Sequence, residues 1–213
     1  MSGIQQVLLS TGRVKTITYV GNTSDTSNTD IYTFSGASIG SPRGDRRVHV
    51  LVAVDGNAGV DLSSVTVGGV TATLNRNATN SSIIGAIATA KLATGTTADI
   101  VVTLTGAKLR CNIGVYASTG LTSETAVDSA QSGVDPGDMT ITTVESGFAI
   151  ALCLTNSGTA TVAWTGVTEN YDTQVESAMA ASGASVATTT TSLNIISTQT
   201  NSGALDRSVC ASF

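Results

Sequence analysis

The stretch Val48-His49-Val50-Leu51-Val52-Ala53-Val54 decides the fold class, because a valine occupies every even position. Side chains of a β-strand point alternately to its two faces, so these valines line one face of a strand. The turn-forming run Asp55-Gly56-Asn57 follows directly. The stretch therefore predicts a β-strand that ends at about residue 54, with His49 on the face shared with Leu51 and Ala53.

A tight hairpin is predicted next along the chain. Two β-branched runs, Ser64–Val67 and Val70–Leu74, flank the pair Gly68-Gly69. Glycine adopts positive φ without a steric penalty, which both central residues of a two-residue hairpin turn require. The apolar face also changes parity at this pair, which agrees with a turn.

Runs of the same kind recur to the end of the chain, separated by Gly, Asn, Asp and Ser. We expect about eleven strands in all, without helical crossovers, and therefore an all-β fold with a two-sheet antiparallel sandwich. Short helices remain an alternative over 86–93 and 177–181. The further strands are expected over 83–92, 98–104, 109–117, 139–144, 148–154, 160–164, 174–181, 184–196 and 205–213.

The first 44 residues differ from the rest. A polar stretch, Gly21–Asp30, lies between two short strand-like pieces at 13–20 and 31–34. We assign residues 1–44 to an N-terminal arm or small β subdomain and residues 45–213 to the β-sandwich domain. The arm could embed in a neighbouring molecule or fold as a first hairpin on its own domain, and both alternatives stay open.

Composition narrows the class of protein. Of the 213 residues only 12% are charged and 4% aromatic, whereas roughly 25% charged residues are typical of a soluble domain. A sequence pI of about 4.6 argues against a basic nucleic-acid binder. The chain contains no run near the roughly 18 apolar residues of a membrane span. Its first residues lack the basic, then apolar, pattern of a secretory signal, so we expect synthesis in a cytosol.

Charge divides unevenly along the chain. Residues 1–110 hold nine basic and six acidic residues, a net charge of +3, whereas residues 111–213 hold one basic and nine acidic residues, a net charge of −8. Such a division could give oppositely charged poles that favour head-to-tail contacts. Interleaving of the two halves in one sandwich would instead average the difference out.

The residues that could carry chemistry are few. His49 is the only histidine and lies within a valine-rich strand, so a Ser-His-Asp hydrolase is disfavoured and we expect no catalytic residue. The oxygen-rich segments 25–30 and 135–138 lack EF-hand spacing and are interpreted as turns, so neither a metal nor a cofactor is predicted. The cysteines are expected as free thiols, and Cys153 with Cys210 is the favoured pair if any two combine.

Two groups of residues are candidates for contact with a ligand or another subunit. Arg43, Arg46 and Arg47 form a local basic cluster that could meet an acidic neighbour or a phosphate. The second group combines two aromatic residues with acidic residues, a pattern that a carbohydrate site could use, although packing in the core and at its rim is the favoured interpretation of both rings. It comprises Trp164, Glu169, Tyr171 and Asp172.

Several segments resemble one family of β-sandwich proteins encoded by tailed bacteriophages and prophages. They are Arg47–Val54, Val65–Val70, Cys111–Tyr116, Ala163–Asp172 and Val209–Phe213. The resemblance implies a jelly-roll sandwich, similar to lectin-like folds, that serves as a virion accessory: a head decoration or cement protein, or a tail or fibre component.

We therefore expect a non-enzymatic structural protein of a bacteriophage particle. The leading hypothesis is a capsid decoration or cement protein that binds neighbouring virion subunits as a homo-oligomer, without nucleic acid or membrane, after synthesis in the host cytoplasm. The alternative is a carbohydrate-binding receptor module of the tail or fibre. A low charge content and abundant Ser and Thr suit broad contacts that repeat across an assembly.

Overall fold

A computed structural model describes residues 13–213, and every regular element in that range is a β-strand. The prediction of an all-β antiparallel sandwich is confirmed. Neither helix alternative, at 86–93 or 177–181, is present, because residues 86–91 and 179–181 lie in paired strands and residues 177–178 lie in a turn. None of the described residues forms a helix long and apolar enough to cross a membrane.

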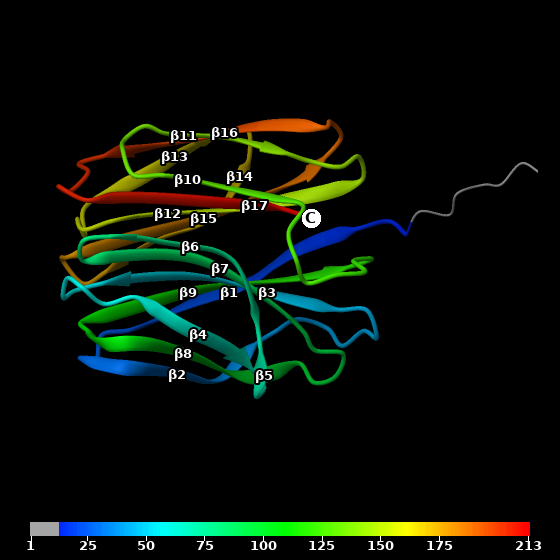
Figure 1. The fold of residues 1–213 in the computed structure, drawn as a ribbon, viewed down its shortest axis with the longest axis horizontal. Coiled ribbons are helices and arrows are strands. Elements are labelled where there is room, and N and C mark those ends of the chain that lie inside the picture. Colours follow the sequence, from blue (N-terminus) through cyan, green and yellow to red (C-terminus); the bar gives the residue numbers. More distant parts are fainter. Residues whose placement is uncertain (1–12) are drawn as a thin grey trace, which may run out of the picture.

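The first half of the chain forms a sandwich of two antiparallel sheets (Figure 1). Sheet A contains, in spatial order, β1 (Thr16–Asp25), β9 (Arg110–Thr119), β3 (Arg47–Asp55), β7 (Ile83–Lys91) and β6 (Thr73–Asn80). Sheet B contains β2 (Thr29–Ser38), β8 (Thr97–Lys108), β4 (Leu62–Val67) and β5 (Val70–Thr71). The predicted Gly-Gly hairpin is confirmed, since β4 pairs with β5 and both glycines have positive φ.

The second half forms another sandwich. Sheet C contains β10 (Asp128–Ser132), β17 (Asp206–Ser212), β12 (Gly147–Thr155), β15 (Met179–Thr188) and β14 (Thr168–Val175). Sheet D contains β11 (Gly137–Thr142), β16 (Ser192–Thr200) and β13 (Thr161–Thr165).

The two halves repeat one topology. When β5 and β6 are counted as a single strand and each half is numbered from its own start, sheets A and C both have the order 1-8-3-6-5. Sheets B and D share the order 2-7-4, which β5 extends in sheet B alone. Eight strands wound in this way give a jelly-roll-like sandwich. The chain therefore contains two such sandwiches in tandem.

The sandwiches stack through their inner sheets, so that four layers follow in the order B, A, C, D (Figure 1). The even valines of β3 pack toward sheet B, whereas Leu51 and Ala53 pack toward Phe148, Leu152 and other side chains of sheet C. A strand buried on both faces explains why this stretch is almost continuously apolar. The expected two-sheet sandwich is thus corrected to four sheets.

Some predicted boundaries were wrong. The expected strands 174–181 and 184–196 each cross a turn, since β14, β15 and β16 are separated by residues 176–178 and 189–191. Glu176 has positive φ in the first of these turns. The second lies within a run of small polar residues that contains no Gly, Pro, Asn or Asp to mark it.

The N-terminal segment also differs from the expectation. β1 and β2 run through most of the polar stretch 21–30, and they pair with β9 and β8 of the same chain. They do not pair with each other, because the turn between them carries the chain from sheet A to sheet B. A boundary at residue 44 would divide both sheets, so within residues 13–44 the expected arm is corrected to two integral strands. Residues 1–12 lie outside the described range.

The halves do not interleave, so the charge difference along the sequence is also a difference in space. Residues 13–119 carry nine basic and six acidic residues, and residues 120–213 carry one and nine. The first sandwich therefore has a net charge of +3 and the second, with its linker, −8.

All three cysteines are buried and free. The favoured pairing of Cys153 with Cys210 is wrong, because β12 and β17 place Cys153 opposite Ser208 and Cys210 opposite Ala151. Burial raises the pKa of the Cys153 and Cys210 thiols to about 12. These thiols are therefore protonated side chains of the core.

His49 lies in the interface between sheets A and C. Its ring nitrogens are hydrogen-bonded to the hydroxyls of Thr89 (2.9 Å) and Ser118 (2.7 Å), and the edges of Phe148 and Phe213 pack around it. Burial, helped by the charge of Arg47, lowers the pKa of His49 to about 3. The imidazole is therefore neutral in the folded protein at neutral pH.

Acidification should consequently destabilise the fold. The ordinary histidine pKa of about 6.5 applies to the unfolded chain, so between pH 6.5 and pH 3 the unfolded state binds the extra proton. We expect the His49 contribution to fall by about 2 kcal/mol between pH 7 and pH 5. Urea unfolding at both pH values measures it, with His49→Gln as the reference; an equal pH dependence in both proteins would contradict the assignment.

Candidate functional site

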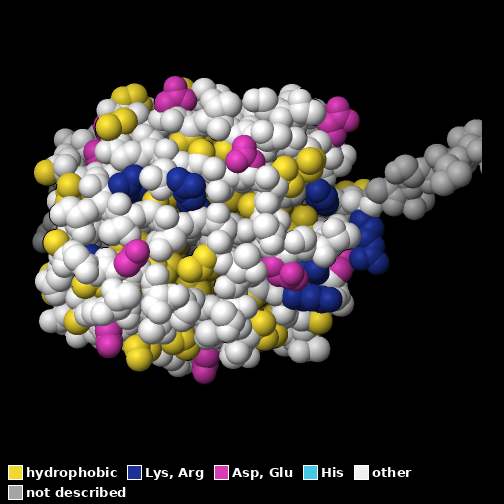
Figure 2. Space-filling view, viewed as in Figure 1, with side chains coloured by type: hydrophobic (Ala, Val, Ile, Leu, Met, Phe, Trp, Pro, Cys, Tyr) yellow, Lys and Arg dark blue, Asp and Glu magenta, His cyan; other side chains and the backbone are white. Residues whose placement is uncertain are grey.

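An open cleft of about 800 Å³ lies beside the point where the described chain begins, and basic side chains line it. Figure 2 shows Lys and Arg side chains gathered next to that point. Residues 119–122, which lead out of β9, form another wall. The four cationic lining residues are Arg13, Arg43, Arg47 and Lys91.

Strand pairing places two of these cations together. β3 and β7 are antiparallel, and their register sets Arg47 directly opposite Lys91. Like charges opposite each other on neighbouring strands destabilise a sheet. Glu124 relieves the repulsion in part, with its carboxylate 2.8 Å from Nε of Arg47. Lys91 is exposed and makes no ion pair within residues 13–213.

Asp45 is the acidic residue that lines the cleft. Its carboxylate accepts a hydrogen bond from the Gly120 backbone N–H (3.0 Å) and lies 3.6 Å from Nε of Arg43 and 3.8 Å from Nη1 of Arg13. The Gly120 hydrogen bond, with smaller contributions from the two arginines, lowers the pKa of Asp45. The lining thus carries four cations and one anion, and Glu124 pairs with Arg47 beside it. The surplus positive charge of the cleft can attract an anionic group.

Arg46 does not belong to this surface, contrary to the sequence hypothesis. It is 1% exposed, and its guanidinium donates hydrogen bonds of 2.6–2.9 Å to four backbone carbonyls. These belong to Gly40, Leu92, Thr94 and Gly95. Arg46 therefore fastens two loops of its own chain, and only Arg43 and Arg47 of the predicted cluster reach the cleft.

Comparison with protein-family models, with curated proteins and with solved structures finds no match to this chain. The assignment of a function therefore depends on the site and on the sequence resemblance.

The second predicted group does not form an aromatic platform. Tyr171 is 7% exposed and is buried between sheets A and C, where its ring stacks on Tyr19 with centroids 5.6 Å apart. Trp164 is half-buried on sheet D, and its indole N–H donates to the Ser182 hydroxyl (2.8 Å). Tyr171 occupies an inward-facing position of β14, so it does not have the exposure that a carbohydrate-binding platform would require.

Glu169 and Asp172 remain on the surface of β14. Asp172 accepts a hydrogen bond from the Val162 backbone N–H (2.9 Å). Desolvation raises the pKa of both carboxyl groups, and the charge of Asp172 raises that of Glu169 further. They form an acidic surface on the second sandwich, and its charge is opposite in sign to that of the cleft.

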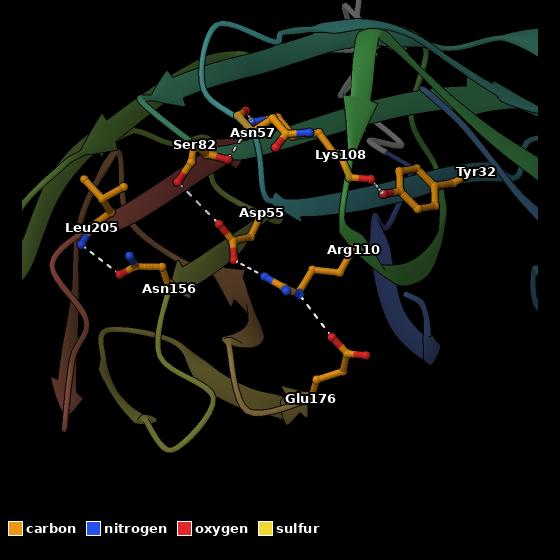
Figure 3. Close-up of polar contacts among 9 residues, drawn as sticks. All are labelled: Tyr32, Asp55, Asn57, Ser82, Lys108, Arg110, Asn156, Glu176 and Leu205. Carbon is orange, nitrogen blue, oxygen red and sulfur yellow. Dashed lines mark hydrogen bonds and ion pairs between the residues drawn. The ribbon is translucent and has the colours of Figure 1, made fainter. Parts of the chain in front are cut away.

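A polar network at another edge of the interface joins the two halves (Figure 3). Arg110 of β9 contacts the carboxylate of Asp55 and reaches Glu176 of the second half at 3.4 Å. Lys108 is fully buried, and its ammonium donates to the backbone carbonyls of Asn57 and Ser82. All of these partners belong to the same chain. The network therefore stabilises the stack of the two sandwiches and does not form a binding site.

Sequence reasoning missed Arg13 and Lys91 as members of the cleft, and Glu124 as the ion-pair partner of Arg47. They lie far apart in the chain, and only the pairing of β3 with β7 and the path of residues 119–124 bring them together. One signal for their proximity was available in the sequence. Lys91 lies at the end of one expected strand and Arg47 at the start of another, and antiparallel pairing of the two strands would bring these residues together.

Proposed function

We propose that the protein is a non-enzymatic structural subunit of a bacteriophage particle, a capsid decoration or cement protein that binds neighbouring virion subunits. The resemblance of segments within residues 45–213 supports the phage assignment. The basic cleft supports a role in subunit binding and is the observation that carries this part of the proposal. It gathers four cations, of which Arg13, Arg43 and Lys91 are exposed, on a chain in which only 12% of residues are charged.

The cleft suits an anionic segment of a neighbouring subunit. Arg47 and Lys91 are held side by side by the strand register, at a cost that an anionic partner would relieve. Arginine can also bind a carboxylate through two parallel hydrogen bonds, which fixes the orientation of the partner. An acidic peptide of the particle surface is therefore the partner that the cleft fits.

The alternative, a carbohydrate-binding receptor module, has less support. Sugar rings stack on exposed aromatic faces, whereas Tyr171 is buried and Trp164 is half-buried with its N–H bonded internally. The acidic pair Glu169 and Asp172 could still accept hydrogen bonds from hydroxyls. The position of the protein in an intact particle separates the two hypotheses.

Cryo-electron microscopy of intact particles directly tests where in the particle the protein is located. A dispersed array on the head is expected of a decoration protein, and absence of the protein from the particle would refute the proposal. A few copies at the tail tip would favour the receptor module instead.

A charge reversal in the cleft tests the binding surface itself. We expect Lys91→Glu to weaken co-sedimentation of the purified protein with particles that lack it by about tenfold, and to reduce the dependence of binding on salt. Arg76→Glu makes the same change of charge on β6, outside the cleft, and should bind normally. Equal loss in both variants would attribute binding to net charge and contradict a specific cleft.

A further inference from the structure

The interior of the second sandwich is apolar at one end and polar at the other. The buried apolar cluster between sheets A and B has 21 members, whereas that between sheets C and D has only six. Beyond the six, the facing strands contribute Ser197 and Ser208, whose hydroxyls are 2.7 Å apart across the two sheets. A polar interior in so small a sandwich needs a partner for each of its polar atoms.

Two side chains face each other next to this hydroxyl pair. Gln199 lies two residues beyond Ser197 on β16, and Asp206 lies two residues before Ser208 on β17. Residues two apart on a strand share a face, so Gln199 and Asp206 both point into the space between sheets C and D. Thr155 pairs with Asp206 in the ladder of β12 and β17 and is fully buried beside it.

Several atoms at this end have no partner. Gln199 is only 7% exposed, and both its Oε1 and its Nε2 are buried without a hydrogen bond. Oδ1 of Asp206 is buried without one as well. Leaving buried donors and acceptors unpaired is costly, so this arrangement indicates a group that the protein chain itself does not supply.

A second carboxylate reaches the same end. Oδ1 of Asp135, in the loop before β11, accepts a hydrogen bond from the Gln199 backbone N–H (2.9 Å). Burial raises the pKa of Asp206, and the charge of Asp135 raises it further. The hydroxyl of Thr155 and the amide of Gln199 lie close enough to its carboxylate to lower the pKa, although neither makes a hydrogen bond of normal geometry to Oδ1. Two carboxylates, an amide and a hydroxyl thus converge where no cationic side chain pairs with either Asp in the described chain.

We propose that Asp135, Thr155, Gln199 and Asp206 bind a divalent cation, Ca²⁺, between sheets C and D. Ca²⁺ prefers oxygen ligands from carboxylates, amides, hydroxyls and water, and it accepts six to eight of them in flexible geometry. A cation would give Oδ1 of Asp206 and Oε1 of Gln199 their missing partner and would remove the repulsion between the two carboxylates. With only two carboxylates, affinity on the order of 10⁻⁴ M is expected. Within residues 13–213 no three His, Cys, Asp or Glu side chains form a metal cluster, so the amide and hydroxyl are essential to the site.

The single tryptophan offers a local probe of this site. Trp164 pairs with Ser197 in the ladder of β13 and β16, two residues from Gln199. Tb³⁺ replaces Ca²⁺ at oxygen sites, and excitation of a nearby indole sensitises its luminescence. We expect titration with Tb³⁺ to give saturable emission on excitation of Trp164, and Ca²⁺ to suppress that emission by competition.

Matched variants decide whether the signal comes from the proposed site. Asp206→Asn and Asp135→Asn should each weaken Tb³⁺ binding at least tenfold, whereas Asp138→Asn, an exposed acid on β11, should leave it unchanged. Ca²⁺ should raise the thermal midpoint of the wild type and of Asp138→Asn only, and circular dichroism in EDTA checks that all variants fold. Absence of sensitised emission, or an equal loss in Asp138→Asn, would overturn the proposal.

Discussion

Replacing Arg46 with methionine is expected to lower the free energy of unfolding by about 4 kcal/mol. The guanidinium is buried, and the substitution removes the donor from four carbonyls at once. Each buried acceptor that loses a charged donor costs roughly 1–3 kcal/mol, reduced where the loops admit water. Chemical denaturation followed by circular dichroism measures the loss.

Arg43→Met provides the matched control for this prediction. Arg43 lies three residues earlier and its side chain is 63% exposed, so the same substitution should change stability by less than about 0.5 kcal/mol. Arg46→Lys keeps the charge but not the planar fork of donors, and it should recover only part of the stability. A loss below about 1 kcal/mol in Arg46→Met would show that the two loops do not depend on this side chain.

Replacing Gly183 with alanine is expected to destabilise the stack by about 3 kcal/mol. A Cβ at this position of β15 would lie 2.2 Å from Cε1 of Tyr171 and 2.8 Å from the hydroxyl of Tyr116, both in the packed interface between sheets A and C. Neither ring can withdraw without disturbing the inner sheets, and overpacking of this kind costs about 1–3 kcal/mol or more. Thermal and urea unfolding report the change.

A double-mutant cycle identifies the clash as the cause. Tyr171→Leu removes the ring that the new methyl group meets, so Gly183→Ala should cost less in that background than in the wild type. Gly21→Ala, where a Cβ meets nothing within 4 Å, controls for the general effect of removing a glycine. An equal cost of Gly183→Ala in both backgrounds would contradict the contact with Tyr171.

The fold could be predicted where local pattern and final environment agree. The alternating valines of β3 and the positive φ at Gly68 and Gly69 follow directly from the sequence. A strand with one solvent-facing side has polar residues at every second position. In β3 two of these positions hold the buried apolar residues Leu51 and Ala53, which was a signal in the sequence that a second layer covers this face. The turn at 189–191 offered no such signal, because small polar residues suit strands and turns alike.

The internal repeat left one trace in the sequence. Val65-Thr66-Val67-Gly68-Gly69-Val70-Thr71 and Val162-Ala163-Trp164-Thr165-Gly166-Val167-Thr168 share Val at the first position and Gly-Val-Thr at the last three. Gly69 and Gly166 both have positive φ. The remainder of the two halves shares topology rather than residues, since packing of a sheet requires apolar character and not particular side chains.

The site was less predictable than the fold, because residues that are adjacent in the sequence can differ completely in burial and in their interaction partners. Arg43, Arg46 and Arg47 lie within five residues, yet one is exposed, one is buried among carbonyls and one is paired with Glu124. Likewise, Tyr171 was grouped with Glu169 and Asp172 as a candidate contact residue. Those two are exposed, whereas the alternation of side chains along β14 places Tyr171 in the interior. In both cases local composition does not show which side chain faces solvent.

The tandem arrangement of two like sandwiches in one chain has a consequence for how the molecule can evolve. Two identical chains related by a two-fold axis must change both outer faces together, since each mutation appears twice. A covalent tandem is free of that requirement. One half is basic overall and the other strongly acidic, +3 against −8, while both have the same strand order. The joined repeat thus combines two sandwiches of one topology with opposite net charges, and this gives the molecule a polarity that a symmetric pair could not possess.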